Sequence, residues 1–485
     1  MLLFGGISAA EAVENPKKPW GQLNDNWRIS GELMGAYENW DYFQPSPAKN
    51  NDNDYDLGVV RARLGLEMKT ALVDGFVQGQ YIGMYGLPSH SVALPGGPLG
   101  LGSAYFSGND DKTAPGNTFL RQAYLNLKGD ALGLQGAFLK AGRFEVKDGD
   151  EYKTGNAKFD QIKKLRVAQR LLGSNAVHVT RTFDGASAVY DNPAFNFTAH
   201  AVRPTQGGFT VQGQDEISDI DVFYAALTGK KDAWLPGTEG RLFYMYYNDD
   251  RDTQVVDNRP AKDRPSLQDE NLELHTVGGH LLAMQTVGSG SVDGLLWGAY
   301  QFGNWTNQRH KGWAIDSEIG YQWNDAPLKP WLRAIYYLSS GDSDSKDNRH
   351  DAFYSMLPSG RIFAKFPFYN LMNLQDAFIE MVLSPTPKTR VTVDLHHLSL
   401  KESNDLFYGG LGATQRQKTF GFVGRATGDE NDLGKLVDVT VSHAFTEELV
   451  GRFYYAHAFG GDVIKNFYRG QKDASTFWVD LTLTF

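Results

Sequence analysis

The chain contains no cysteine. A disulfide framework and a thiolate metal site are therefore both excluded. It also lacks any continuous apolar run near the ~20 residues that a membrane-spanning helix requires, and its mean hydropathy is -0.40. Helices therefore cannot carry this chain across a membrane. A basic excess is missing as well, since the formal net charge is -10, which argues against nucleic acid as a partner.

Glycine (53 residues) and aromatic residues (13%) are plentiful, and the final stretch, 475–485, shows how aromatic and other apolar residues are arranged. Apolar and mostly polar residues alternate there, with Phe477, Val479, Leu481, Leu483 and Phe485 on one face of a strand and Trp478, Asp480, Thr482 and Thr484 on the other. A soluble edge strand this apolar would be prone to aggregate. A strand that closes a barrel in lipid avoids the problem, because its apolar face meets hydrocarbon and both edges are paired.

Eighteen segments with strand character can be placed from residue 26 onward. They are 26–37, 57–70, 73–86, 117–128, 134–147, 175–190, 194–204, 217–229, 238–250, 271–286, 291–304, 309–323, 330–341, 374–385, 388–402, 432–446, 449–460 and 474–485. The links after even-numbered strands are short, whereas all but one of the links after odd-numbered strands are long and polar; 305–308 is the exception. Short turns on one rim and long loops on the other are typical of an up-and-down barrel in the bacterial outer membrane.

The faces of the strands support this interpretation. In segment 57–70, Val60, Ala62, Leu64 and Leu66 alternate with charged residues that include Arg61, Arg63 and Glu67. A barrel of this many strands has a lumen too wide for strand side chains to fill. We therefore expect the apolar faces to point outward to lipid and the interior to be wet. Trp27 and Tyr37, Trp297 and Trp305, and Trp313 and Trp323 are candidates for the two interfacial aromatic girdles, although packing aromatics are an alternative.

The predicted fold is all-β: one transmembrane antiparallel up-and-down barrel of about 18 strands, residues 26–485, with long extracellular loops at 87–116, 148–174, 342–373 and 403–431. Residues 1–25 are set apart. Met1 to Ala12 has a short apolar core and a small-x-small pattern, Ala10-Glu11-Ala12, that is consistent with the remnant of a secretory signal or with a flexible N-terminus.

Two motifs carry a resemblance to a known family. Leu139-Lys140-Ala141-Gly142-Arg143-Phe144-Glu145 and Arg181-Thr182-Phe183-Asp184-Gly185 resemble segments of the alginate export family of outer-membrane barrels. Ser340-Gly341-Asp342, Leu357-Pro358 and Asn373-Leu374 follow in the order found in that family's C-terminal half. The resemblance implies an eighteen-stranded barrel with an arginine-lined conduit for acidic polysaccharide. It also shows a departure, because the exporters have a long periplasmic segment where this chain has only Glu447-Glu448.

Parity along the strands predicts a set of inward charges, and the loop 148–174 adds cations of its own. We expect this loop to fold into the barrel and narrow it, so that its cations and the inward arginines favour anionic or polyhydroxylated solutes; a solvated outer loop is the alternative. The predicted pore-lining and solute-binding residues are Arg61, Arg63, Glu67, Arg143, Glu145, Arg166, Arg170, Arg181, Arg333, Arg390, Asp394 and Asp438.

Catalysis fits the sequence poorly. His396 and His397 lie on opposite faces of one strand and cannot share a metal ion, so we predict no catalytic residue, no metal site and no cofactor. The expected partners are outer-membrane lipid and lipopolysaccharide and a small hydrophilic or anionic sugar-type solute, with a homo-oligomer or a protein complex left open. The predicted function is passive diffusion or export of hydrophilic solutes through an integral outer-membrane channel, with an acidic oligo- or polysaccharide such as alginate as one candidate solute. The alternatives are a docking barrel with little conductance, a barrel phospholipase or protease, and a soluble β-rich lyase or propeller.

Overall fold

The structure, a computed structural model, describes residues 21–45, 52–93, 97–173, 178–358, 363–366, 368–415 and 419–485. Most of the predicted signal remnant, residues 1–20, lies outside the described residues. No helix within the described ranges is long and apolar enough to cross a membrane.

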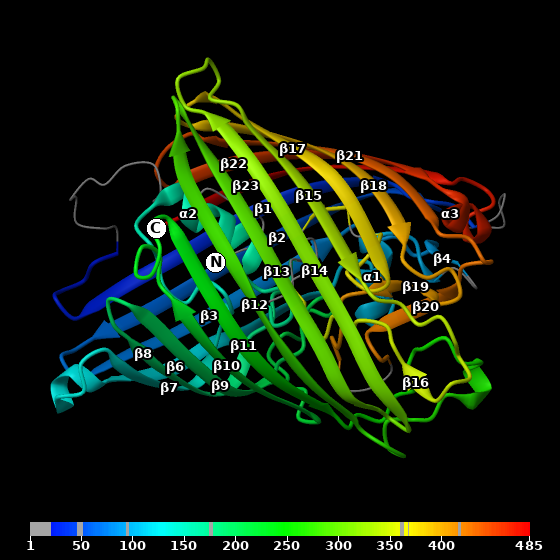
Figure 1. Ribbon diagram of the computed structural model, residues 1–485, viewed down its shortest axis with the longest axis horizontal. Coiled ribbons are helices and arrows are strands. Elements are labelled where there is room, and N and C mark those ends of the chain that lie inside the picture. The colour runs from blue at the N-terminus through cyan, green and yellow to red at the C-terminus, as the bar shows by residue number, and fades with distance from the viewer. Residues whose placement is uncertain are drawn as a thin grey trace.

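Eighteen antiparallel strands close into one barrel, because β1 pairs with both β2 and β23 (Figure 1). The strands are β1 (Trp27–Asp41), β2 (Asp54–Lys69), β3 (Val73–Tyr85), β6 (Gly116–Lys128), β7 (Ala137–Phe144), β8 (Phe183–Asp191), β9 (Phe195–Pro204), β10 (Ile220–Gly229), β11 (Thr238–Asp249), β12 (Leu272–Val287), β13 (Gly290–Trp305), β14 (Gln308–Trp323), β15 (Trp331–Ser339), β17 (Leu374–Thr386), β18 (Thr389–Leu400), β21 (Asp432–Ala444), β22 (Leu449–Gly460) and β23 (Asp473–Thr484). The predicted fold class is confirmed.

The connections sort by length onto two rims, as the sequence predicts, with the two-residue link between β13 and β14 as the predicted exception. The long loops carry small elements of their own: β4 (Val92–Ala93), β5 (Gly97–Pro98), α1 (Leu101–Gly108), α2 (Ala157–Ile162), a π-helical turn η3 (Lys163–Val167), a 3-10 turn η4 (Ala261–Asp263), β16 (Arg349–His350), β19 (Leu406–Gly410), β20 (Phe422–Ala426) and α3 (Asp462–Phe467). Among the short links, only the 3-10 turn η2 (Gly129–Leu132) has such an element. We therefore take the rim with the long loops as extracellular and the other as periplasmic.

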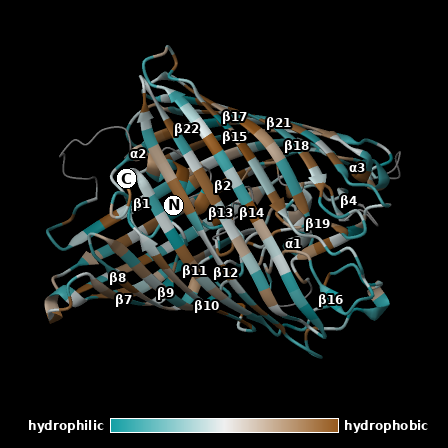
Figure 2. Cartoon of the chain, viewed as in Figure 1, coloured by the Kyte–Doolittle hydropathy of each residue, from teal (hydrophilic) through white to brown (hydrophobic). Residues whose placement is uncertain are grey.

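The outer surface is apolar because alternate residues point away from the lumen. Leu64 is 62% exposed and Leu481 50%, whereas Arg61 and Asp480, on the opposite faces of the same two strands, are 0% and 6% exposed. Figure 2 shows hydrophobic and hydrophilic residues mixed along the strands in this way. Such a pattern suits a wall with hydrocarbon on one side and a polar interior on the other.

Two expectations about single segments are wrong. Trp297 and Trp305 are buried inside the barrel and belong to no girdle; Trp305 stacks on His350 with ring centroids 3.8 Å apart. In segment 175–190, residues 175–177 lie outside the described residues, and the strand begins at Phe183. Of the residues before it, 178–182 are buried and make contacts inside the lumen instead of joining the sheet.

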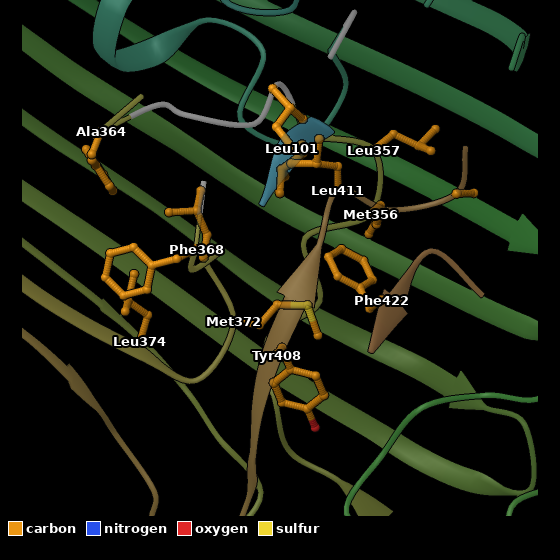
Figure 3. Packing of buried hydrophobic residues seen from close by; sticks show 14 of the residues in the cluster. Leu101, Met356, Leu357, Ala364, Phe368, Met372, Leu374, Tyr408, Leu411 and Phe422 are labelled. Carbon is orange, nitrogen blue, oxygen red and sulfur yellow. The ribbon is translucent and has the colours of Figure 1, made fainter. Parts of the chain in front are cut away.

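The lumen is also less open than a wide, water-filled bore, because the long loops fold into its extracellular half. Their apolar side chains form one buried cluster with inward residues of the strands. Figure 3 shows part of that cluster, with Leu101, Met356, Leu357, Leu411 and Phe422 from the loops grouped together and Phe368 drawn beside Leu374 of β17. The side chains of the strands alone cannot fill the lumen of an eighteen-stranded barrel. The loops supply the missing apolar volume.

Candidate functional site in the barrel lumen

The segment between β7 and β8 enters the barrel, and we call its described residues, 145–173 and 178–182, the inner loop. The side chain of Asn156 accepts a hydrogen bond from the Phe159 N–H at 3.0 Å and caps α2, which begins the helical part of the loop. Phe159, Ile162 and Val167 then pack against wall residues Leu282, Leu295, Trp331 and Val382. The wall residues lie near the periplasmic ends of their strands, so the inner loop reaches the periplasmic half of the lumen.

The cations of the inner loop meet carboxylates of the wall. Arg166 binds Glu380 and Arg170 binds Asp316, while Lys163 lies 2.9 Å from Glu239 and Lys158 3.5 Å from Asp293. Burial lowers the pKa of Lys158, and Asp293 partly offsets this. The pKa of Arg166 is raised, because Glu380 and Glu318 outweigh the effect of its burial. The loop is thus held across the lumen by charge pairs.

Arg333 of β15 lies among the same carboxylates. Its guanidinium is 3.1 Å from Asp293, 2.7 Å from Glu318 and 3.8 Å from Glu380. Arg166 and Arg170 are only 3% and 1% exposed. In this arrangement the arginines neutralise carboxylates of the wall and hold the inner loop against it. Their direct contact with a solute stays a prediction.

A second group of arginines lies on the wall formed by β2, β3 and β6. Arg61 binds Glu32 at 2.8 Å, and Arg63 donates to Gln80 at 2.6 Å and to Thr180 at 2.8 Å. Arg121 donates to the same Thr180 hydroxyl at 3.0 Å and pairs with Glu145. This row is therefore covered by the end of the inner loop.

Arg181, in that same end of the inner loop, has no carboxylate partner among the described residues. Its guanidinium donates to the carbonyl oxygens of Thr205 and Ala413, and Nη1 has no hydrogen-bond partner. Burial lowers the pKa of Arg181, yet arginine keeps its charge in proteins. A buried, uncompensated positive charge is costly, and an anion would relieve that cost.

A polar cavity of about 420 Å³ opens near the periplasmic ends of β6 to β9. Lys140 lines it and forms no ion pair within the part of the chain that the structure describes; its ammonium lies 4.6 Å from the ring centre of Tyr124. The cavity also offers amides, a hydroxyl, two aromatic rings and further charges: Asn126, Phe138, Glu151, Tyr152, Lys153, Ser187, Asp191, Asn196 and Lys230.

A larger polar cavity, of about 620 Å³, lies at the extracellular end of the same part of the wall. It is lined by residues of the loops that follow β3 and β9, such as Asn109, Lys112, Gln206 and Gln212, and by Asn117 at the start of β6. The two cavities mark the two ends of one section of the barrel, β6 to β9.

The remaining predicted site residues are dispersed. Glu67 faces the lumen beside Lys69 at 3.1 Å, and Arg390 lies half-buried on the inner face near the periplasmic end of β18. Asp394 and Asp438 are buried opposite each other on β18 and β21.

Arg143 does not line the lumen. The ladder pairs it with Ala123, two residues from outward Leu125, and it binds Asp184 of β8 at 2.7 Å. Its strand parity is that of outward Leu139, so the motif arginine lies on the outer face near the extracellular rim.

Strand parity alone could not find Arg121, Lys163 or Asp148. The register between β3 and β6 shifts at one point, because Gln78 pairs with Gln122 and the next residue, Gly79, pairs with Leu120. Arg121 is therefore the extra residue of a β-bulge. Lys163 and Asp148 lie in the inner loop, where no strand alternation predicts which way a side chain points.

Comparison with known proteins decides the family. The sequence matches the family described as "Alginate export" over residues 105–477, which is most of the chain. The chain belongs to the alginate export family. No match was found among curated protein sequences. The protein is an integral barrel of the bacterial outer membrane and a channel for the diffusion or export of solutes, and its family and fold point to a transporter.

Solved outer-membrane proteins share the fold of this member of the alginate export family. OccAB2 of Acinetobacter baumannii is 9% identical with a TM-score of 0.60, covering 96% of this chain and 99% of that one. OccK9 (OpdG) of Pseudomonas aeruginosa is 13% identical with a TM-score of 0.58 and covers 95% and 98%. The outer-membrane protein OpdK of Pseudomonas aeruginosa is 12% identical with a TM-score of 0.54 and covers 94% and 98%.

Proposed function

We propose that this alginate export family barrel conducts anionic, sugar-type solutes along the β6 to β9 section of its wall. The observation that carries the proposal is Lys140, a lysine in a polar cavity with no ion-pair partner among the described residues. By contrast, Arg166, Arg170 and Arg333 are paired with carboxylates of the wall, which neutralise their charge. A cation without an ion-pair partner at the mouth of a channel attracts anions and raises their local concentration.

The chemistry of the cavity supports an acidic sugar as the solute. Asn126, Asn196 and Ser187 offer amides and a hydroxyl for sugar hydroxyl groups, and Phe138 and Tyr152 offer rings for the apolar faces of a pyranose. Lys140 supplies the charge for a carboxylate. Arg181, further along the lumen and without a carboxylate partner, is a second position where an acid group would be stabilised.

The test is ion selectivity in planar bilayers. Lys140→Glu should lower the ratio of anion to cation permeability, seen as a shift of the reversal potential in a salt gradient, and should slow liposome swelling by glucuronate more than by glucose. Lys465→Glu in α3, where the lysine side chain is 69% exposed, is the matched control and should leave both readouts unchanged. Equal shifts in the two variants would contradict the assignment of Lys140.

A docking barrel with little free conductance is the second candidate, and one observation favours it. The apolar loop cluster that includes Leu101, Leu357 and Phe422 fills much of the extracellular half of the lumen. An electrically silent barrel in the same bilayers would support this candidate and contradict the channel route proposed above.

A further inference from the structure

Three potential metal ligands converge on the inner face of β18 and β21. Asp394 lies directly opposite Asp438 in the ladder, and His396 is two residues further along the same face of β18. One ligand atom from each of the three residues lies within 4.8 Å of the others. All three side chains are buried, with exposures of 6%, 4% and 2% for Asp394, His396 and Asp438.

Each of the three side chains also has one buried atom with no hydrogen-bond partner among the described residues. Oδ1 of Asp394, Nε2 of His396 and Oδ2 of Asp438 are each buried and unpaired, and the last two are 3.9 Å apart. A buried polar atom without a partner costs about 1–3 kcal/mol, and more when it is charged. Three such atoms in one place therefore indicate that a ligand completes the group.

The other nitrogen of His396 is held in the way that a metal ligand requires. Nδ1 lies 3.0 Å from Oδ1 of Asp376 on β17, and the ring stacks on Phe378 with centroids 4.2 Å apart. A carboxylate that accepts the Nδ1 proton fixes the tautomer in which Nε2 carries the lone pair. The same contact fixes the plane of the ring, so that Nε2 lies on the side of Asp394 and Asp438.

The nearby cations make their direct contacts with other groups, although Arg166 and Lys365 still attract the two aspartates electrostatically. Arg166 binds Glu380, Arg452 binds Asp480 at 2.8 Å, and Lys365 donates to the Thr440 hydroxyl at 3.0 Å while also attracting Asp438 electrostatically. The carboxylates around His396 therefore leave room for further positive charge.

We propose that Asp394, His396 and Asp438 form a site for a divalent transition-metal ion of the Zn²⁺ class. One imidazole nitrogen and two carboxylate oxygens suit Zn²⁺, whereas Ca²⁺ and Mg²⁺ prefer oxygen ligands alone. Three protein ligands leave a coordination position for water or for a solute carboxylate. A bound ion would tie β18 to β21 and add positive charge to the lumen wall beside Glu380.

The experiment uses the full chain, purified in detergent, freed of metal with a chelator and titrated with Zn²⁺ against a chromophoric competitor. We expect one tight ion per chain. Asp376→Asn should weaken binding about ten-fold or more, and His396→Gln at least as much. His397→Gln is the matched control, because His397 is the next residue, exposed on the opposite face, and its replacement should leave the affinity unchanged.

Two further readouts keep the test independent of folding and transport. Co²⁺ added to the unsubstituted protein should give the visible absorption of a site with nitrogen and oxygen ligands, and His396→Gln should abolish it while the barrel keeps its heat-modifiable migration on gels. Lys365→Met should tighten Zn²⁺ binding, because a competing positive charge is removed. Zn²⁺ affinity that is equal in the unsubstituted, His396→Gln and Asp438→Asn proteins would overturn the site, whatever the conductance of the channel.

Discussion

At the scale of single residues, the barrel contains a buried ionisable side chain whose nearest cation is already paired with another carboxylate. Asp148, at the start of the inner loop, is 8% exposed and its Oδ1 has no hydrogen-bond partner. Arg241 is close enough to attract it, but its guanidinium binds Glu151 at 2.6 Å. Burial therefore raises the pKa of Asp148 to about 8.

Asp148 should make the folded barrel less stable as the pH rises. In the unfolded chain this carboxyl loses its proton near its ordinary pKa of 3.8, whereas in the folded protein it keeps the proton up to about pH 8. Its contribution to stability is thus lost between these two values as the pH rises. We expect Asp148→Asn to raise the thermal midpoint at pH 8, by an amount corresponding to about 2 kcal/mol, and to flatten the fall of the midpoint between pH 5 and pH 8.

Thermal unfolding of the detergent-solubilised barrel, followed by gel migration at several pH values, measures this effect. Asp150→Asn is the matched control, since Asp150 lies two residues away and is paired with Lys153 at 2.8 Å. Its replacement should not raise the midpoint. A fall in midpoint with pH that persists unchanged in Asp148→Asn would contradict the prediction.

At the scale of elements, the strands follow from the sequence while the interior does not. Alternation of apolar and polar residues over ten or more positions fixes both the existence and the facing of a strand such as β2, and the short link after it fixes its periplasmic end. A bulge defeats the same rule, as at Arg121 of β6, where one extra residue changes the parity. Arg143 shows a related error, because it is predicted to point inward and the ladder register places it on the outer face.

The sequence predicts that the inner loop carries cations, but it does not predict that carboxylates of the wall neutralise them. Arg170 and Asp316 are far apart in the sequence and meet only after the barrel has closed. No local pattern records such a pair, because the partners belong to different elements. The same limit applies to Asp394, His396 and Asp438, where strand parity places each side chain inward but only the register brings β18 beside β21.

The docking of the inner loop should depend on these charge pairs. Arg170→Glu places like charges beside Asp316 and Glu318, the second of which lies 3.7 Å from Arg170 in the native arrangement. We expect the loop to leave the wall and the single-channel conductance to rise about two-fold or more, because repulsion between buried like charges costs several kcal/mol. The double variant Arg170→Glu with Asp316→Lys should return the conductance toward the original value.

Single-channel recording measures the result of this charge reversal, with Arg349→Glu as the control. Arg349 lies in an extracellular loop, its side chain is 46% exposed and it pairs with Asp347 and Asp351, so its reversal should leave the conductance unchanged. A conductance equal to that of the unsubstituted protein in Arg170→Glu would show that apolar packing of Phe159 and Ile162 suffices to hold the loop.

At the scale of the whole molecule, the question is whether the two polar cavities are joined. One lies at each end of the β6 to β9 wall, and the end of the inner loop lies between them. Because the chain has no cysteine, a single introduced cysteine can report access without background. Ser187 lines the cavity near the periplasmic ends of β6 to β9 and is paired in the ladder with Lys140. Ala188, the next residue, is exposed on the lipid face.

We expect Ser187→Cys to react with a small anionic thiosulfonate added on the extracellular side of a planar bilayer, and the current to fall as it reacts. The cationic analogue should react more slowly, because Lys140 attracts anions to this position. Ala188→Cys should not react, since hydrocarbon covers it. If Ser187→Cys reacts only from the periplasmic side, the inner loop and the loop cluster above it form a complete barrier. Solute would then pass only after the loops move, and a docking role would explain the filled lumen better than free diffusion.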